Sequence, residues 1–139
     1  MAVPTFESVQ VGDALPDLLL PQVNRTTLTL FAGASGDHNP IHIDLDFARR
    51  AGLPDVIAHG MLGMAWLGRL LTSWCGQSRL RRFDARFIGI IQVGHIITCR
   101  GEVIEKLAQE GERRVRVRVR ATNQYGEDKI LGEGLLALP

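Results

Sequence analysis

The sequence has few cysteines, few aromatic residues and almost no net charge, and each shortage excludes a class of protein. Cys75 and Cys99 stand alone, without a Cys-x-x-Cys spacing, so neither a disulfide framework nor a cysteine-based metal site is indicated. Basic and acidic residues number 16 and 15, the formal charge is +1, and aromatic residues make up 6%. Such a composition lacks the basic surface and the stacking side chains typical of nucleic-acid binding.

Long hydrophobic runs are also missing. Arg69 interrupts the longest apolar stretch, which falls short of the roughly 18 residues that cross a bilayer. Residues 1–7 contain no basic segment leading into an apolar run, so we expect no secretory signal. We therefore expect a cytoplasmic protein with two buried, reduced thiols. A length of 139 residues, 45% of them hydrophobic, predicts a single domain spanning 1–139.

The first part of the chain indicates short elements. Residues 9–13 read as a short strand and turn, and residues 18–23 as an extended segment. Thr26 or Thr27 is a candidate N-cap for a short helix that runs toward Ala34, where a Ser-Gly pair stops it.

Two further helices are indicated downstream. Asp44 is a candidate N-cap for a short helix through Arg50. Residues 60–74 form the longest helical candidate and leave almost no polar face, so we expect this helix to be buried nearly all round. Gly63 and Gly68 each cost about 1 kcal/mol relative to Ala in a helix interior. That cost predicts close approach of another backbone or of a ligand.

After Gly76 the hydrophobic period becomes that of strands. Four strands are indicated. Apolar and charged residues alternate over 82–87, and residues 96–104 are a second candidate. Valines and arginines alternate over 114–120, and after a turn at 123–128 the last candidate spans 129–138. One long buried helix followed by an antiparallel meander predicts an α+β protein with a helix on a curved sheet.

The most informative segment places a carboxylate, Asp37, five residues before an imidazole, His42. Asn39 and Pro40 lie between them, so the backbone turns there and cannot continue as a helix. A rigid turn that holds an acid and a base is what proton-transfer chemistry needs. The plainer alternatives are an Asp that caps a turn and a histidine that is structural.

This segment resembles the motif of the R-specific enoyl-CoA hydratases, the MaoC-like or hydratase 2 family. The motif positions are Phe31, Ser35, Gly36, Asp37, Asn39, Pro40, Ile41, His42 and Ala48, and a second matching block is Ala58-His59-Gly60-Met61-Leu62. The resemblance covers most of the chain and is strongest over residues 26–76. It implies a hot-dog fold, in which a curved antiparallel sheet wraps a long central helix, and it implies no cofactor and no metal.

The resemblance also implies catalytic roles. Asp37 and His42 would share the proton transfers of a syn addition of water. The backbone N–H of Gly60, at the start of the buried helix, would stabilise the thioester carbonyl, because the first-turn donors of a helix are unpaired. A glycine needed only for close packing is the alternative. Some homodimeric relatives carry an assisting Ser eight residues later, where this chain has Gly68.

Four further residues are candidates for substrate binding. Asn39 would orient the water or the loop, or would only form an Asx turn. Pro40 would fix the angle between the two catalytic side chains. His59 and Met61 would line the substrate pocket.

Two other patterns suggest functions besides hydration, namely metal binding and the binding of an acidic partner. His38 and His42 have the i, i+4 spacing of a helical metal site, but Pro40 argues against a helix there. The arginines over residues 113–120 alternate with valines, which a solvated strand face explains. Docking of coenzyme A phosphates or of an acidic acyl carrier protein is one alternative, and nucleic-acid binding is another.

The expected function is that of an R-specific 2-enoyl-thioester hydratase, or equally a (3R)-hydroxyacyl-thioester dehydratase. The substrate would be an acyl-CoA or an acyl carrier protein thioester, with no nucleic acid and no membrane involved. We expect a homodimer, or a heterodimer with another hot-dog subunit. The alternatives are a hot-dog acyl-CoA thioesterase and a subunit of a heteromeric dehydratase.

Overall fold

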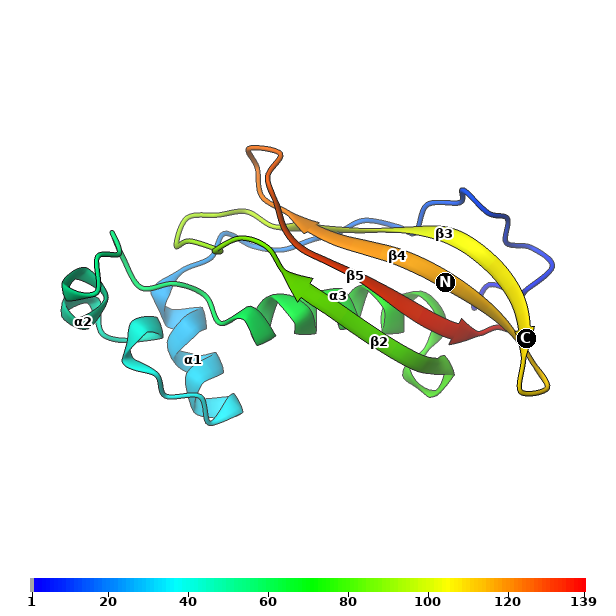
Figure 1. Cartoon of the computed structure of the whole chain (residues 1–139), viewed down its shortest axis with the longest axis horizontal. Coiled ribbons are helices and arrows are strands. Elements are labelled where there is room, and N and C mark those ends of the chain that lie inside the picture. Colours follow the sequence, from blue (N-terminus) through cyan, green and yellow to red (C-terminus); the bar gives the residue numbers. More distant parts are fainter. Residues whose placement is uncertain (1) are drawn as a thin grey trace.

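A curved antiparallel sheet lies along one side of a single long helix (Figure 1). The computed structural model describes residues 2–139, and its five strands have the order β1-β3-β4-β5-β2. The elements are β1 Leu18–Leu19, α1 Arg25–Ser35, the 3-10 helix η1 Pro40–His42, α2 Leu45–Arg50, α3 Gly60–Cys75, the 3-10 helix η2 Gln77–Arg79, β2 Leu80–Phe87, β3 Thr98–Gln109, β4 Glu112–Thr122 and β5 Asp128–Ala137. The expected helix on a curved antiparallel sheet is confirmed.

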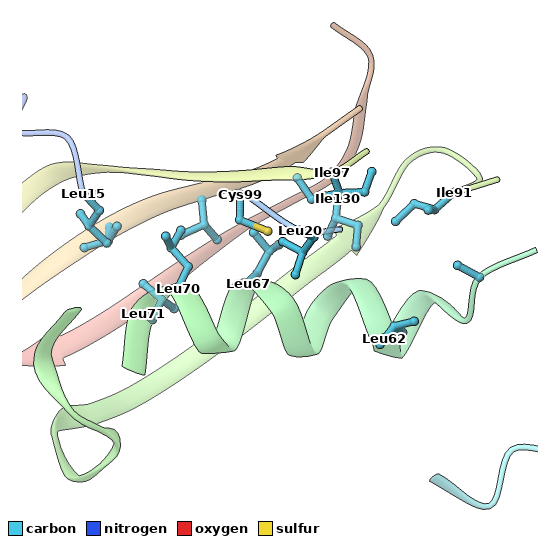
Figure 2. Packing of buried hydrophobic residues seen from close by; sticks show 14 of the residues in the cluster. Leu15, Leu20, Leu62, Leu67, Leu70, Leu71, Ile91, Ile97, Cys99 and Ile130 are labelled. Atoms are coloured by element: carbon cyan, nitrogen blue, oxygen red, sulfur yellow. The ribbon is translucent and has the colours of Figure 1, made fainter. Parts of the chain in front are cut away.

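The core lies between α3 and the sheet. Leu67 and Leu71 of α3 have no exposed surface, and neither do the three valines of β4, which are Val115, Val117 and Val119. In Figure 2 Leu67, Leu70 and Leu71 of α3 point toward the strands. Full burial of a side chain of this size contributes about 1.5–3 kcal/mol, so these contacts hold α3 firmly against the sheet.

One face of α3 remains uncovered in the single chain. Met61, Ala65, Arg69 and Ser73 are exposed, and their four-residue spacing places them in one stripe. The expectation that this helix is buried nearly all round is therefore wrong for the chain by itself. No helix among residues 2–139 is both long and apolar enough to cross a membrane.

The two short helices have well-defined ends. α1 begins two or three residues earlier than expected, because Asn24 rather than Thr26 or Thr27 is its N-cap and accepts a hydrogen bond from the Thr27 N–H at 2.8 Å. α1 ends where expected, at Gly36, whose φ of 76° suits a residue without a side chain. The expected cap Asp44 is confirmed for α2, since its carboxylate accepts from the Phe47 N–H.

Two strand predictions need correction. Residues 9–13 form a turn and no strand, because the Gln10 N–H bonds the Asp13 carboxylate at 2.8 Å. β3 extends to Gln109, five residues past the expected end at Ile104. The pairing of β3 with β4 shifts between Val103 and Glu105. Such a bulge breaks the two-residue alternation, so the periodic pattern stops before the strand does.

Gly63 and Gly68 differ in what surrounds them. A Cβ on Gly63 would overlap Ile130 Cδ1 and lie 3.2 Å from Ile91 Cδ1, whereas a Cβ on Gly68 would meet the Phe83 ring at an ordinary 3.4 Å. Gly63 is thus closely approached, but by side chains and not by the backbone or ligand that we expected. Ile130 and Ile91 are buried and have little room to move.

We predict that Gly63→Ala destabilises the protein by about 1–3 kcal/mol, because the added methyl overpacks a filled core. Gly33→Ala in α1 is the matched control, since a Cβ there has nothing within 4 Å. That change should stabilise the protein by about 0.5–1 kcal/mol through helix propensity. Urea unfolding of both variants measures the difference. Equal shifts of the same sign would contradict the packing argument.

Candidate active site

Three separate segments meet where α3 begins. They are the α1–α2 connection, residues 56–59 and the β2–β3 connection. The Ile57 N–H bonds the Ile41 carbonyl at 3.2 Å, and the Ala58 N–H bonds the Ile91 carbonyl at 3.0 Å. In Figure 1, α1 and α2 lie at the end of the molecule where α3 starts. The expected catalytic residues Asp37, His42 and Gly60 are brought together here.

The loop that carries Asp37 is built from short-range hydrogen bonds. The Asp37 N–H donates to the Ser35 hydroxyl at 3.2 Å, and Asp37 Oδ1 accepts from the Asn39 N–H at 3.2 Å. The Asn39 side-chain oxygen accepts from the Ile41 N–H at 3.1 Å. Of the two roles considered for Asn39, the Asx turn is therefore observed. Pro40 follows as the first residue of η1.

His42 is held by the backbone on one side of its ring. It is 9% exposed, and its Nδ1 lies 2.7 Å from the Ile57 carbonyl oxygen. Because a carbonyl only accepts hydrogen bonds, Nδ1 must carry the proton. The neutral ring therefore has its lone pair on Nε2, which is the nitrogen left for proton transfer.

His59 contacts both expected catalytic residues. It is 1% exposed, and its ring stacks on His42 with centroids 3.7 Å apart and planes inclined by 23°. Its Nε2 lies 3.1 Å from the Asp37 carbonyl oxygen, so by the same reasoning Nε2 carries the proton. Phe31 meets the ring edge-on at 4.9 Å. The sequence placed His59 at the pocket, and a single sequence carries no signal for these contacts.

The other ring nitrogen of His59 is unusual. Nδ1 is buried and has no hydrogen-bond partner among the described residues. A buried polar atom left unpaired costs about 1–3 kcal/mol. Nearly all buried polar groups in proteins are paired, so an exception calls for an explanation.

Asp37, His42 and His59 form one compact cluster. One carboxylate oxygen and one nitrogen from each ring all lie within 4.8 Å of one another. Gaps of this size accommodate a water molecule that hydrogen-bonds two groups at about 2.8 Å each. The stacked rings suit a metal ion poorly, because lone pairs in two nearly parallel planes do not converge on one point.

A pocket of about 260 Å³ opens beside this cluster. Its polar side is formed by His42, His59 and the first residue of α3, Gly60. The remaining wall is largely apolar and includes Ile57, Phe87, Ile90, Ile91 and Ile130. The N–H of Gly60 has no intrahelical acceptor and lies at the positive end of the helix dipole. The pocket therefore combines an imidazole, an unpaired backbone donor and an apolar surface, while the Asp37 carboxylate lies in the adjoining cluster and is not among the residues that line the pocket.

Met61 is located differently from what the sequence suggested. It is 58% exposed, and neither Met61 nor Asn39 nor Pro40 lines this pocket. Met61 belongs instead to the exposed stripe of α3. A helix that is apolar on all sides gives no sign of which side faces a pocket.

Thiol nucleophiles are excluded from the site. Both cysteines are buried as expected, and burial raises the pKa of Cys75 to about 11 and that of Cys99 to about 12. The reactive thiolate form is therefore scarce at neutral pH.

Three of the five arginines of β4 pair with glutamates. Arg116 pairs with Glu105 at 2.8 Å and with Glu133 at 3.6 Å. Arg114 is buried, so the expectation of a solvated strand face is wrong for this residue. Its guanidinium pairs with Glu110 at 3.0 Å and with Glu112 at 2.8 Å. These pairs balance part of the charge on which the docking alternatives relied.

Comparisons with known proteins agree with the geometry. The family model described as "MaoC like domain" matches residues 13–125. A 3-hydroxybutyryl-CoA dehydratase of Methylorubrum extorquens is 31% identical over 137 residues, which are 96% of this chain and 83% of that protein. The fatty acid synthase subunit beta of Saccharomyces cerevisiae is 32% identical over 88 residues, 61% of this chain, and the match spans 4% of its length.

Solved structures are similar over nearly the whole chain. The unliganded R-hydratase PhaJ1 from Pseudomonas aeruginosa has a TM-score of 0.86 at 29% identity, covering 97% of this chain and 85% of that one. A chain of the ChsH1-ChsH2 complex from Mycobacterium tuberculosis has a TM-score of 0.80 at 25% identity, covering 94% and 98%.

Proposed function

The chain belongs to the MaoC-like family, and we propose that it is an R-specific hydratase of 2-enoyl thioesters, which in reverse dehydrates (3R)-hydroxyacyl thioesters. The observation that supports this most is the cluster of Asp37 and His42 beside an apolar pocket whose polar end is Gly60. Each of these groups matches one requirement of the reaction. The hot-dog fold of the chain is the one that the resemblance implied.

The proposed reaction conserves every proton. A water held between the Asp37 carboxylate and His42 loses one proton to one of these groups, and its oxygen bonds Cβ of the enoyl chain. The electrons of the double bond move to the thioester oxygen, which accepts a hydrogen bond from the Gly60 N–H. The pair then delivers a proton to Cα on the same face. His42 acts through Nε2, since Nδ1 is committed to Ile57.

We predict that the purified protein removes the ultraviolet absorbance of the conjugated enoyl group of crotonyl-CoA. Asp37→Asn and His42→Gln should each lower kcat by about 100-fold to 10,000-fold, because proton transfer to a positioned group contributes that much. A thiol reagent in the same assay should detect no free coenzyme A. Release of thiol would identify a thioesterase. A folded but inactive wild type would favour a different acyl group or a subunit that needs a partner.

The role proposed for Gly60 has a separate test, since proline is tolerated as the first residue of a helix. His59, with φ −59° and ψ 135°, already has the extended conformation required before proline. Gly60→Pro removes the N–H and should lower kcat by about 100-fold to 1,000-fold. Gly60→Ala is the matched control, because it keeps the N–H and makes the same Cβ contact with Phe87 at 3.2 Å. Equal losses in both variants would indicate a packing role alone.

We further propose that the chain pairs with a second hot-dog subunit, most simply another copy of itself. The exposed stripe of α3 and the free edge of strand β2 are two surfaces left uncovered in the single chain. Light scattering during size exclusion should give twice the chain mass of 15.3 kDa. A monomeric mass would contradict self-pairing and leave a different subunit as the partner.

A further inference from the structure

His59 lies where three parts of the site meet. Its ring covers His42 on one face, its Nε2 bonds the Asp37 carbonyl, and the next residue along the chain is Gly60. Its remaining nitrogen, Nδ1, is buried and unpaired among the described residues. His59 lines the pocket, but almost none of its Nδ1 is accessible, so this nitrogen is not available to take a proton from a substrate.

The loop around Asp37 depends on His59 for its attachment to the rest of the protein. Residues 36–39 are all exposed, so apolar packing does not hold them. Their other hydrogen bonds reach no farther than four residues along the chain. Among the described residues, the bond from His59 Nε2 is the one that joins this loop to a distant segment, 22 residues away. His42 has its own anchor at Ile57.

We propose that His59 is a positioning residue that sets the distance between Asp37 and His42. The ring fixes His42 by stacking, and the N–H fixes the Asp37 backbone, so one rigid side chain relates the carboxylate to the imidazole. This role rests on the proposed hydratase function. It also explains the unpaired Nδ1, because an imidazole that donates through Nε2 necessarily carries a second nitrogen into this buried position.

Two substitutions separate the ring from its N–H group. His59→Phe keeps a ring against His42 and Phe31, loses the bond to Asp37 and removes the unpaired nitrogen. His59→Gln loses the ring but keeps an amide N–H that reaches the position of Nε2. His38→Gln serves as the control, because His38 is an exposed histidine of the same loop.

We expect His59→Phe to lower kcat by about 10-fold to 100-fold, since small displacements of reacting groups cost that much. KM should stay within about twofold and Tm should be unchanged or higher. His59→Gln should recover part of kcat, and His38→Gln should match the wild type. Wild-type kcat in His59→Phe would overturn the proposal.

Amide hydrogen exchange provides a readout that does not depend on activity. The Asn39 and His42 amides, which bond within the loop, should exchange faster in His59→Phe than in the wild type and His59→Gln. Unchanged exchange would overturn the positioning role. If the wild type is inactive on enoyl thioesters, the proposed function fails, while the exchange result still decides whether His59 holds the loop.

Discussion

Burial of one face of α3 in the concave side of the sheet is the interaction on which the rest of the structure depends. Leu67 and Leu71 pack with the valines of β4 and fix the direction of the helix axis. The helix dipole and the unpaired first N–H groups then point to one place, where Gly60 lies. Every other part of the site is arranged around that helix start.

Backbone carbonyls, rather than other side chains, organise the ionisable groups of the site. The Ile57 carbonyl bonds one ring nitrogen of His42, and the Asp37 carbonyl bonds one of His59. Carbonyls have a single hydrogen-bonding role, so each ring is left with a defined tautomer before any substrate arrives. Catalytic groups arranged in advance in this way need little reorganisation during a reaction.

Much of the fold was predictable because it follows from periods in the sequence. The alternation of valine with arginine identified β4, and the apolar run from Gly60 identified α3, since both patterns come from local geometry. Asn24 was missed as a cap because Thr26 and Thr27, two and three residues later, offered similar side chains. The bulge near Ile104 was missed because it depends on pairing with β4, which no local pattern encodes.

The site was predictable in part for the same reason. Asp37 and His42 lie in one short turn, so their proximity follows from the sequence. The stacking of His59 on His42 depends on a contact between separate segments, and so does the position of Met61 outside the pocket. These features follow from tertiary packing, which a motif does not describe.

Most of the pocket wall comes from a different part of the chain than the polar groups of the site. Asp37, His42, His59 and Gly60 occupy one continuous stretch, whereas Phe87, Ile90, Ile91 and Ile130 of the wall come from the strands and connection that follow. Evolution can therefore remodel the wall, and with it the range of molecules accommodated, without rebuilding the reactive centre. Substitutions in the segments that follow α3 would therefore change what fits the pocket while leaving its polar groups in place.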